Sequence, residues 1–302
     1  MFAAPPAIET RVFASLPDEL RLARPSLVTQ VIGRNVDSFL EGPSFDLHGN
    51  LYCVDIPFGR IFRIDAQGRF EQFVEYDGQP NGLKIHRDGR LFVADRKHGI
   101  VVIDPVERRV QYLIEGADLE RFLGPNDLVF SPQGDLYFTD QGMSDYAHPT
   151  GRVFRLRADG RLELLLDGLV SPNGIALDAS GRTLYVALTR ANCIIRALLQ
   201  PDGRVTRVQQ FIQLSGGGGP DGIAVDADGG LVVAHPMMGA VWLFDSKGQP
   251  ALRVNLCRGQ LGTNVAFGGP DFRRLYITES ETGTIQTAEL PVRGTALFSH
   301  AT

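Results

Sequence analysis

The sequence predicts an all-β protein, a six-bladed β-propeller built from four-stranded antiparallel blades. A related stretch occurs six times, and its copies start roughly 40 to 48 residues apart. Each copy has the same order of short apolar runs separated by glycine-containing turns. Glycine is abundant, with 34 residues that cluster in short turns, which is typical of many brief strands. A solenoid is the alternative, but it would require a more uniform period and distinct capping units.

Each copy opens with a polar residue that is followed by an apolar run. The copies start at Glu41, Asn81, Asn126, Asn173, Asp221 and Asn264. In the fifth copy the run Ile223–Val225 leads through the turn Asp228–Gly230 to a second run, Leu231–Ala234. A third run, Val241–Phe244, follows, and other copies add a fourth such as Gly160–Gly168. Asp-Gly and Gly-Gly turns between such runs indicate hairpins, so each copy is expected to form one blade.

No linker divides the repeats, so we expect residues 1–302 to form a single propeller domain. The blades should occupy residues 36–290, because the last copy ends near Leu290. Residues 1–35 precede the first clear copy and are expected to close the ring. Within them, Ser26–Arg34 is the stretch that we expect to supply the outermost strand of a neighbouring blade.

The composition argues against several classes of protein. The formal net charge of −5 does not favour binding to nucleic acid, and no apolar run approaches the roughly 20 residues of a membrane helix. The first residues lack the basic segment of a signal peptide. The three cysteines are Cys53, Cys193 and Cys257, an odd number at scattered positions that predicts free thiols and not a disulfide framework. A cytoplasmic location is expected.

The polar residues that open the copies are candidate site residues. Each stands at the start of a predicted innermost strand, and innermost strands line the central channel, so six oxygen-bearing side chains should converge at one mouth. Asn and Asp are also turn formers, which is the alternative explanation for each of them singly. The turn explanation does not extend to the whole set, because Glu41 is a poor turn former and yet occupies the same position in its copy. Converging carboxylates repel each other unless a cation lies between them. An all-oxygen shell suits a hard divalent ion, chiefly Ca²⁺ or Mg²⁺. The sequence has no matching cluster of Cys and His residues, which disfavours a zinc site.

Four motifs carry a resemblance to a known family. They are "EGPSFD" from Glu41, "GPNDLVFSPQGDLYFTD" from Gly124, "SPNGIALD" from Ser171 and "GPDGIAVD" from Gly219. With them, the stretch from Glu41 to Leu290 resembles the senescence-marker-protein/gluconolactonase family, which includes regucalcin and bacterial lactonases. The segment Tyr137–Leu156 is most similar to the lactonase branch. The resemblance implies a six-bladed propeller with one divalent metal ion at the channel mouth.

The resemblance also implies roles for individual residues. The metal ligands would be Glu41, Asn173 and Asp221, together with Asn126, which would reach the metal directly, through water or by contacting substrate. Asp127, the next residue, could take this role in place of Asn126. Asn81 and Asn264 would line the pocket. The implied cation is Ca²⁺ first, with Mg²⁺, Mn²⁺ and Zn²⁺ as alternatives.

The chemistry expected at such a site is hydrolysis of a lactone. A divalent cation polarises a carbonyl and lowers the pKa of a bound water, and Asp221 is the candidate general base. The sequence contains no Gly-x-Ser-x-Gly motif for a nucleophilic serine. The expected partner is a small lactone or ester, bound by a monomer or small homo-oligomer. A strictosidine-synthase-like or phosphotriesterase-like enzyme and a non-catalytic metal- or ligand-binding propeller remain the alternatives.

Residues at the ends of the second strands should reach the same mouth. Asp140 would be a pocket wall or a turn cap, and His235 a proton shuttle, a substrate contact or simply a packing residue beside Pro236. The loops at this rim contain further polar and apolar side chains, and rim loops usually set specificity. These are Arg96, Lys97, Met143, Tyr146, His148, Met237 and Met238.

Overall fold

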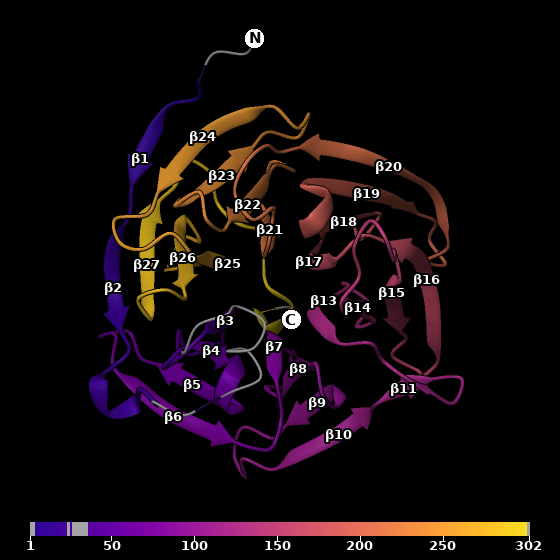
Figure 1. Cartoon of the computed structure of the whole chain (residues 1–302), viewed down its shortest axis with the longest axis horizontal. Coiled ribbons are helices and arrows are strands. Elements are labelled where there is room, and N and C mark those ends of the chain that lie inside the picture. Colours follow the sequence, from indigo (N-terminus) through magenta and orange to yellow (C-terminus); the bar gives the residue numbers. More distant parts are fainter. Residues whose placement is uncertain (1–3, 23–24, 26–35, 301–302) are drawn as a thin grey trace.

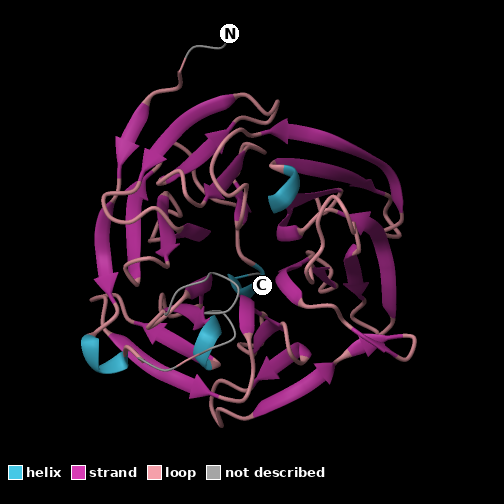
Figure 2. Cartoon of the chain, in the orientation of Figure 1, coloured by secondary structure: helices cyan, strands magenta, loops and turns pink. Residues whose placement is uncertain are grey.

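The computed structural model describes residues 4–22, 25 and 36–300, and its strands form six blades around a central channel (Figure 1). The predicted six-bladed propeller is therefore confirmed. Within these described residues, helical structure is limited to short 3₁₀ turns (Figure 2), which are η1 (Asp18–Leu20), η2 (Ile56–Phe58), η3 (Thr189–Ala191) and η4 (Phe298–His300). Within the described part of the chain, no helix has the length and apolar character needed to cross a bilayer.

The blades are numbered here in chain order, and each runs from the innermost strand outward. Blade 1 consists of β3 (Leu40–Phe45), β4 (Leu51–Asp55), β5 (Arg60–Ile64) and β6 (Phe70–Glu75). Blade 2 consists of β7 (Pro80–Ile85), β8 (Leu91–Asp95), β9 (Gly99–Ile103) and β10 (Val110–Ile114). Blade 3 consists of β13 (Pro125–Phe130), β14 (Leu136–Asp140), β15 (Gly151–Leu156) and β16 (Leu162–Leu169). A small hairpin, β11 (Gly116–Ala117) with β12 (Glu120–Arg121), lies between blades 2 and 3 in the sequence.

The second half of the ring follows the same plan. Blade 4 consists of β17 (Pro172–Leu177), β18 (Thr183–Leu188), β19 (Cys193–Leu199) and β20 (Val205–Gln213). Blade 5 consists of β21 (Ile223–Val225), β22 (Leu231–His235), β23 (Ala240–Phe244) and β24 (Pro250–Asn255). Blade 6 consists of β25 (Gly262–Gly268), β26 (Arg274–Glu279) and β27 (Thr284–Glu289), and its fourth strand comes from the N-terminal part of the chain.

The ring is closed by two N-terminal strands. β2 (Arg11–Ser15) pairs antiparallel with β27 and becomes the outermost strand of blade 6. β1 (Ala7–Glu9) pairs in parallel with β24 and adds a fifth strand to blade 5. The stretch that the sequence suggested for closure, Ser26–Arg34, lies outside the described residues. The outermost strand of blade 6 comes from an earlier part of the chain, Arg11–Ser15.

The hairpins and the core explain why the repeated pattern folds into blades. In the turn between β3 and β4, Asp46 Oδ1 accepts hydrogen bonds of 2.9 Å from the backbone N–H groups of both His48 and Asn50. An Asp side chain that binds the backbone of its own turn in this way stabilises a tight reversal. The apolar runs then pack between neighbouring blades. One cluster joins buried side chains of blade 1, such as Ile61, to those of blade 2, such as Val93, so that the core lies between the sheets.

Candidate active site at the channel mouth

A β-bulge marks the start of most innermost strands. The pairing register between the first and second strands shifts at Glu41/Ser44, Pro80/Gly82, Pro125/Leu128, Pro172/Ile175 and Gly262/Asn264. A bulge inserts an unpaired residue, bends the strand and redirects a side chain. In this protein the bulged stretches contain Asn81, Asn126 and Asn173 and lie directly beside the paired residues Glu41 and Asn264. These side chains are therefore released from the regular alternation of the sheet at the end of the channel where the inner strands start.

Glycines next to these polar residues allow neighbouring blades to approach closely. Gly42 has φ +56°, and a Cβ built on it would lie 2.7 Å from the Asn81 backbone oxygen. A Cβ on Gly82 would lie 2.5 Å from Asp127 Oδ1. The same close approach to the next blade occurs at Gly174 and Gly222. The glycine of each polar–Gly dipeptide is thus explained by the close contact between neighbouring blades, and not by a tight turn, which was the alternative explanation.

The register corrects the placement of Asn264. Asn264 pairs with Thr278, and its N–H donates to Thr278 Oγ1 at 3.1 Å. Asp127 makes the corresponding bond, in which its N–H donates to Thr139 Oγ1 at 3.0 Å. Asn264 is therefore the counterpart of Asp127, one residue later than the sequence alignment assumed. Thr263 occupies the first position in blade 6, and Asp127 and Asn264 take the place that glycine holds in the other blades.

Asp127 and Asn264 meet across the channel. They come from blades 3 and 6, which face each other in a six-membered ring, and Asn264 Nδ2 lies 3.4 Å from Asp127 Oδ2. The same Nδ2 group donates to Glu41 Oε2 at 2.8 Å, and the Gly42 N–H donates to that oxygen at 2.6 Å. Lys84 Nζ lies 3.9 Å from Asp127 Oδ1 on another side. One connected polar cluster thus joins blades 1, 2, 3 and 6.

Burial and mutual repulsion raise the pKa values of the carboxylates in this region. Burial, followed by repulsion from Asp127, raises the pKa of Glu41 to about 7. The pKa of Asp221 is raised well above its ordinary value by burial and then by Glu41, while a hydrogen bond with the Asn173 side chain acts in the opposite direction. Burial also raises the pKa of Asp127, which Lys84 partly offsets. Because Lys84 is a single positive charge among three carboxylates, the arrangement favours either protonation or an added cation.

Asn126 belongs to a second network, between blades 3 and 4. Its Nδ2 group donates to Gln141 Oε1 at 2.9 Å, and Gln141 Nε2 donates to Ser171 Oγ at 3.0 Å. Ser171 lies two residues before Asn173 and has a φ of +54°, which is strained for a non-glycine residue. With its nitrogen committed to Gln141, Asn126 has no hydrogen bond to its side-chain oxygen from the described residues, so this oxygen is available as an acceptor or ligand.

The acids at the ends of the second strands fix the start of the innermost strands. Asp140 accepts a hydrogen bond of 2.7 Å from the Gly124 N–H and pairs with Arg152 at 2.6 Å. Asp55, its counterpart in blade 1, accepts one of 2.7 Å from the Phe39 N–H. In both blades the donor immediately precedes the innermost strand. These contacts are those of a cap, which was one of the two roles expected for Asp140.

The structure also shows the surroundings of His235 and Asn81. His235 Nε2 lies 3.0 Å from the Gly216 carbonyl oxygen, and Trp242 Nε1 donates to His235 Nδ1 at 3.2 Å. Burial lowers the pKa of His235, so the ring is neutral and carries its proton on Nε2. Both ring nitrogens are engaged within the protein, which is the arrangement expected of a packing histidine. Asn81 is half-buried, and its backbone oxygen lies against Gly42.

The donor set has the chemistry of a site for a hard cation, with one restriction. Among the described residues, no three side chains of the His, Cys, Asp or Glu type come together closely enough to hold a metal ion by themselves. A cation at this mouth would therefore need amide oxygens in addition to carboxylates, and Asn126 and Asn173 offer them. Glu41 Oε1 makes no hydrogen bond to any residue of the described ranges and could face the cation, while Oε2 is held by Gly42 and Asn264.

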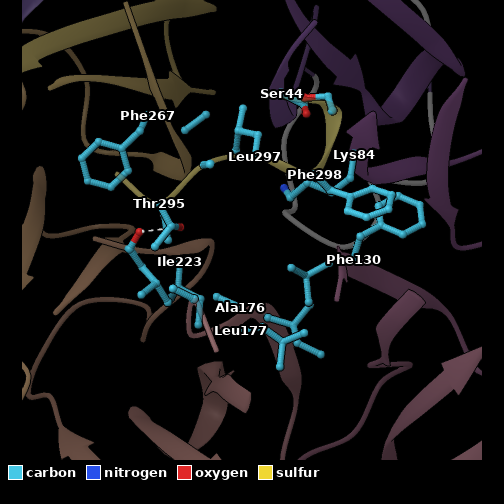
Figure 3. Close-up of a pocket in the computed structure, with 18 of the residues that line it drawn as sticks. Ser44, Lys84, Phe130, Ala176, Leu177, Ile223, Phe267, Thr295, Leu297 and Phe298 are labelled. Carbon is cyan, nitrogen blue, oxygen red and sulfur yellow. Dashed lines mark hydrogen bonds between the residues drawn. The ribbon is translucent and has the colours of Figure 1, made fainter. Parts of the chain in front are cut away.

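An apolar cavity occupies the channel on the other side of the polar cluster. Its volume is about 330 Å³, and side chains of the innermost strands and the C-terminal segment line it (Figure 3). The C-terminal segment packs against this end, because Ser299 Oγ donates to the Phe45 carbonyl oxygen at 3.0 Å and Phe298 stacks on Phe130 with ring centroids 4.9 Å apart. Lys84 is among the lining residues. Sequence reasoning missed Lys84, although a lysine in the otherwise apolar run Leu83–Ile85 was a visible signal.

Comparison with known proteins identifies the family. The profile described as "SMP-30/Gluconolactonase/LRE-like region" matches residues 39–281. The chain belongs to this family. It is 34% identical over 225 residues to lactonase drp35 from Staphylococcus aureus (strain bovine RF122 / ET3-1), which covers 70% of this chain and 68% of that protein. It is 32% identical over 225 residues to lactonase drp35 from Staphylococcus saprophyticus, again covering 70% and 68%.

Solved structures agree with the fold. A gluconolactonase from Xanthomonas campestris superposes with a TM-score of 0.74 at 26% identity, covering 84% of this chain and 86% of that one. A protein from Agrobacterium tumefaciens described as a calcium-binding protein, regucalcin, superposes with a TM-score of 0.79 at 23% identity, covering 97% and 98%. The predicted family membership is confirmed by the profile match and by the similarity to the lactonases.

Proposed function

We propose that this protein is a divalent-metal-dependent lactonase that opens the ring of a small lactone with a metal-activated water. The observation that carries the proposal is the pair of carboxylates Glu41 and Asp221. Burial raises the pKa of both, repulsion from Glu41 raises the pKa of Asp221 further, and Asp127 does the same to Glu41, at a channel mouth that also presents the amides of Asn126 and Asn173. Two like-charged groups in a buried site with free oxygens call for a cation between them. The names of the relatives, lactonase drp35 and gluconolactonase, support the reaction class.

The metal site of this proposal uses Glu41, Asn126, Asn173 and Asp221 as ligands. Their all-oxygen character favours Ca²⁺, with Mg²⁺, Mn²⁺ and Zn²⁺ as alternatives. When bound, the ion would polarise the lactone carbonyl and lower the pKa of a water molecule. The hydrogen bonds from Gly42 and Asn264 to Glu41 hold that carboxylate in one orientation before any ion binds.

Asp221 acts as the general base. Its carboxylate takes one proton from the attacking water while the water oxygen bonds to the lactone carbonyl carbon. The ring C–O bond then breaks, and the protonated Asp221 returns the proton to the leaving alkoxide, so that the product is a hydroxy acid. Asp221 suits this task because a carboxylate is a stronger base than the amides of the other proposed ligands Asn126 and Asn173, and Glu41 is held by Gly42 and Asn264. His235 is a weaker candidate because both of its ring nitrogens are already occupied.

The partner in this proposal is a small lactone or ester, bound by a monomer or small homo-oligomer in the cytoplasm. The experiment is a pH-stat screen of small lactones with and without chelator, followed by metal analysis of the same samples. Chelator-sensitive ring opening supports the proposal. Turnover that survives complete metal removal would favour a strictosidine-synthase-like enzyme. Tight metal binding without turnover of any lactone or ester would favour a non-catalytic binding protein.

A further inference from the structure

Two arginines hold one loop of the channel mouth from opposite sides. The loop, Gln141–Thr150, connects β14 and β15 in blade 3. Arg96 follows β8 in blade 2, and its Nη2 group lies 3.1 Å from Met143 Sδ. Arg190 belongs to η3 in blade 4, and its Nη1 group donates to the Ser144 carbonyl oxygen at 2.7 Å. Two guanidinium groups from different blades therefore contact adjacent residues of the same loop.

Both arginines lie beside the segments that lead to proposed metal ligands. The Arg96 side chain packs on Gly124, where an added Cβ would lie 3.0 Å from Arg96 Cγ. Gly124 is two residues before Asn126. Arg190 Nη1 lies 3.4 Å from Ser171 Oγ, and Ser171 is two residues before Asn173. The two cationic groups therefore flank the part of the mouth where blades 3 and 4 present their amides.

Neither guanidinium has a carboxylate partner among the described residues, although other arginines of the same face do. Arg152, which also belongs to blade 3, pairs with Asp140 at 2.6 Å. The acid in the shared loop, Asp145, accepts a hydrogen bond from the His148 N–H at 2.8 Å and forms none with the arginines. Burial and the nearby Arg190 lower the pKa of Arg96, in keeping with two like charges near each other. A guanidinium nevertheless stays charged at any physiological pH.

A purely structural role would leave much of this pair unexplained. Arginine has five N–H donors, whereas thioether sulfur is a weak acceptor and is the only side-chain acceptor that Arg96 meets among the described residues. Arg190 is exposed and uses one of its terminal nitrogens on Ser144 and Ser171. Two neighbouring cations with spare donors and no internal counter-charge match the planar, two-oxygen geometry of a carboxylate or phosphate.

We propose that Arg96 and Arg190 form an anion-binding subsite that recognises an acidic group on the substrate. The substrate class is then a lactone that carries a carboxylate or a phosphate outside the ring. This inference rests on the proposed lactonase function and narrows it. The acidic group lies between the two guanidinium groups, and the ring carbonyl lies at the mouth beside Glu41, Asn126, Asn173 and Asp221.

The kinetic test compares two lactones that share one ring, γ-butyrolactone and its γ-carboxylate. The selectivity ratio is kcat/KM for the acidic lactone divided by kcat/KM for the neutral one. In the Arg96→Met/Arg190→Met double variant this ratio should fall about 10- to 100-fold, as expected for loss of hydrogen bonds to a charged group. Arg207→Met is the matched control, because Arg207 lies exposed on the outer strand β20. An unchanged ratio in the double variant, or an equal fall in the control, would overturn the proposal.

A binding measurement separates this inference from the lactonase proposal itself. Titration calorimetry of chelator-treated protein with inorganic phosphate and, separately, with succinate requires no turnover. The wild type should bind at least one of the two anions, and whichever binds identifies the acidic group. Binding should weaken about 10-fold or more in the double variant and remain in Arg207→Met. If neither anion binds the wild type, or if the double variant binds as well as the wild type, the subsite does not exist even in an active lactonase.

Discussion

Replacement of Glu41 by glutamine should have opposite effects with and without metal. The pKa of about 7 lies well above the ordinary value of 4.5, and burial is the main cause. Keeping Glu41 ionised at pH 8 therefore lowers the free energy of unfolding of the metal-free protein by about 3 kcal/mol, since each unit of pKa difference between the folded and unfolded states corresponds to about 1.4 kcal/mol. The folded state binds this proton more tightly than the unfolded chain does. The contribution of Glu41 to stability is consequently complete below pH 4.5 and is lost as the pH rises through 7.

The assay is thermal or urea unfolding at pH 5 and pH 8, in chelator or in excess Ca²⁺. In chelator, Glu41→Gln should exceed the wild type in free energy of unfolding at pH 8 by up to about 3 kcal/mol, and by much less at pH 5. Excess Ca²⁺ at about 1,000 times its dissociation constant should stabilise the wild type by about 4 kcal/mol and leave the variant unchanged. Glu120→Gln, at an exposed position, is the control. The reasoning fails if Ca²⁺ stabilises both proteins equally, or if Glu41→Gln is destabilising in chelator at pH 8.

Three further changes test other parts of the structure. Asp221→Asn, at confirmed full metal occupancy, should reduce lactone hydrolysis about 10²- to 10⁴-fold, and a near wild-type rate would remove Asp221 from the role of base. Gly222→Ala should place a Cβ against the Asn264 side chain and so weaken stability in urea unfolding and Ca²⁺ affinity in calorimetric titration. Gly218→Ala is the control, because the nearest neighbour of its Cβ would be a flexible sulfur at 3.4 Å, and neither quantity should change. Phe298→Ala should cost about 2 kcal/mol in urea unfolding because it removes a half-buried stacked ring, and an unchanged midpoint would show that this ring does not anchor the C-terminal segment.

The blades could be predicted because their information is local. Each copy carries its own apolar runs and turn residues, and the Asp46 turn shows how one side chain specifies a reversal without help from the rest of the fold. Ring closure depends instead on which distant segment reaches β27. Several N-terminal stretches have suitable apolar character, so Arg11–Ser15 could not be distinguished from Ser26–Arg34 by sequence alone. The pairing of β2 with β27 is a contact between opposite ends of the chain.

The site could be predicted in part. The polar residues that open the inner strands lie in the expected places except in blade 6, where alignment on the polar residue instead of the apolar run shifted Asn264 by one position. A second signal was present, because Thr139 and Thr278 occur in the two blades that replace the glycine and supply the hydroxyl groups that bind Asp127 and Asn264. Lys84 was missed because it approaches Asp127 from the neighbouring blade, and the sequence of a single repeat does not reveal contacts between blades.

The exception to the polar–Gly pattern explains how the channel is divided. In four blades a glycine at this point lets the next blade approach, and in blades 3 and 6 the side chains of Asp127 and Asn264 stand there instead. Those two blades face each other, so the contact of 3.4 Å between the side chains crosses the channel. On one side lie the carboxylates and amides of the mouth, and on the other lies the apolar cavity of about 330 Å³ that the C-terminal segment helps to line. Under the proposed function, a lactone would therefore approach the polar cluster from the mouth where the inner strands start, which is the face that carries the loop held by Arg96 and Arg190.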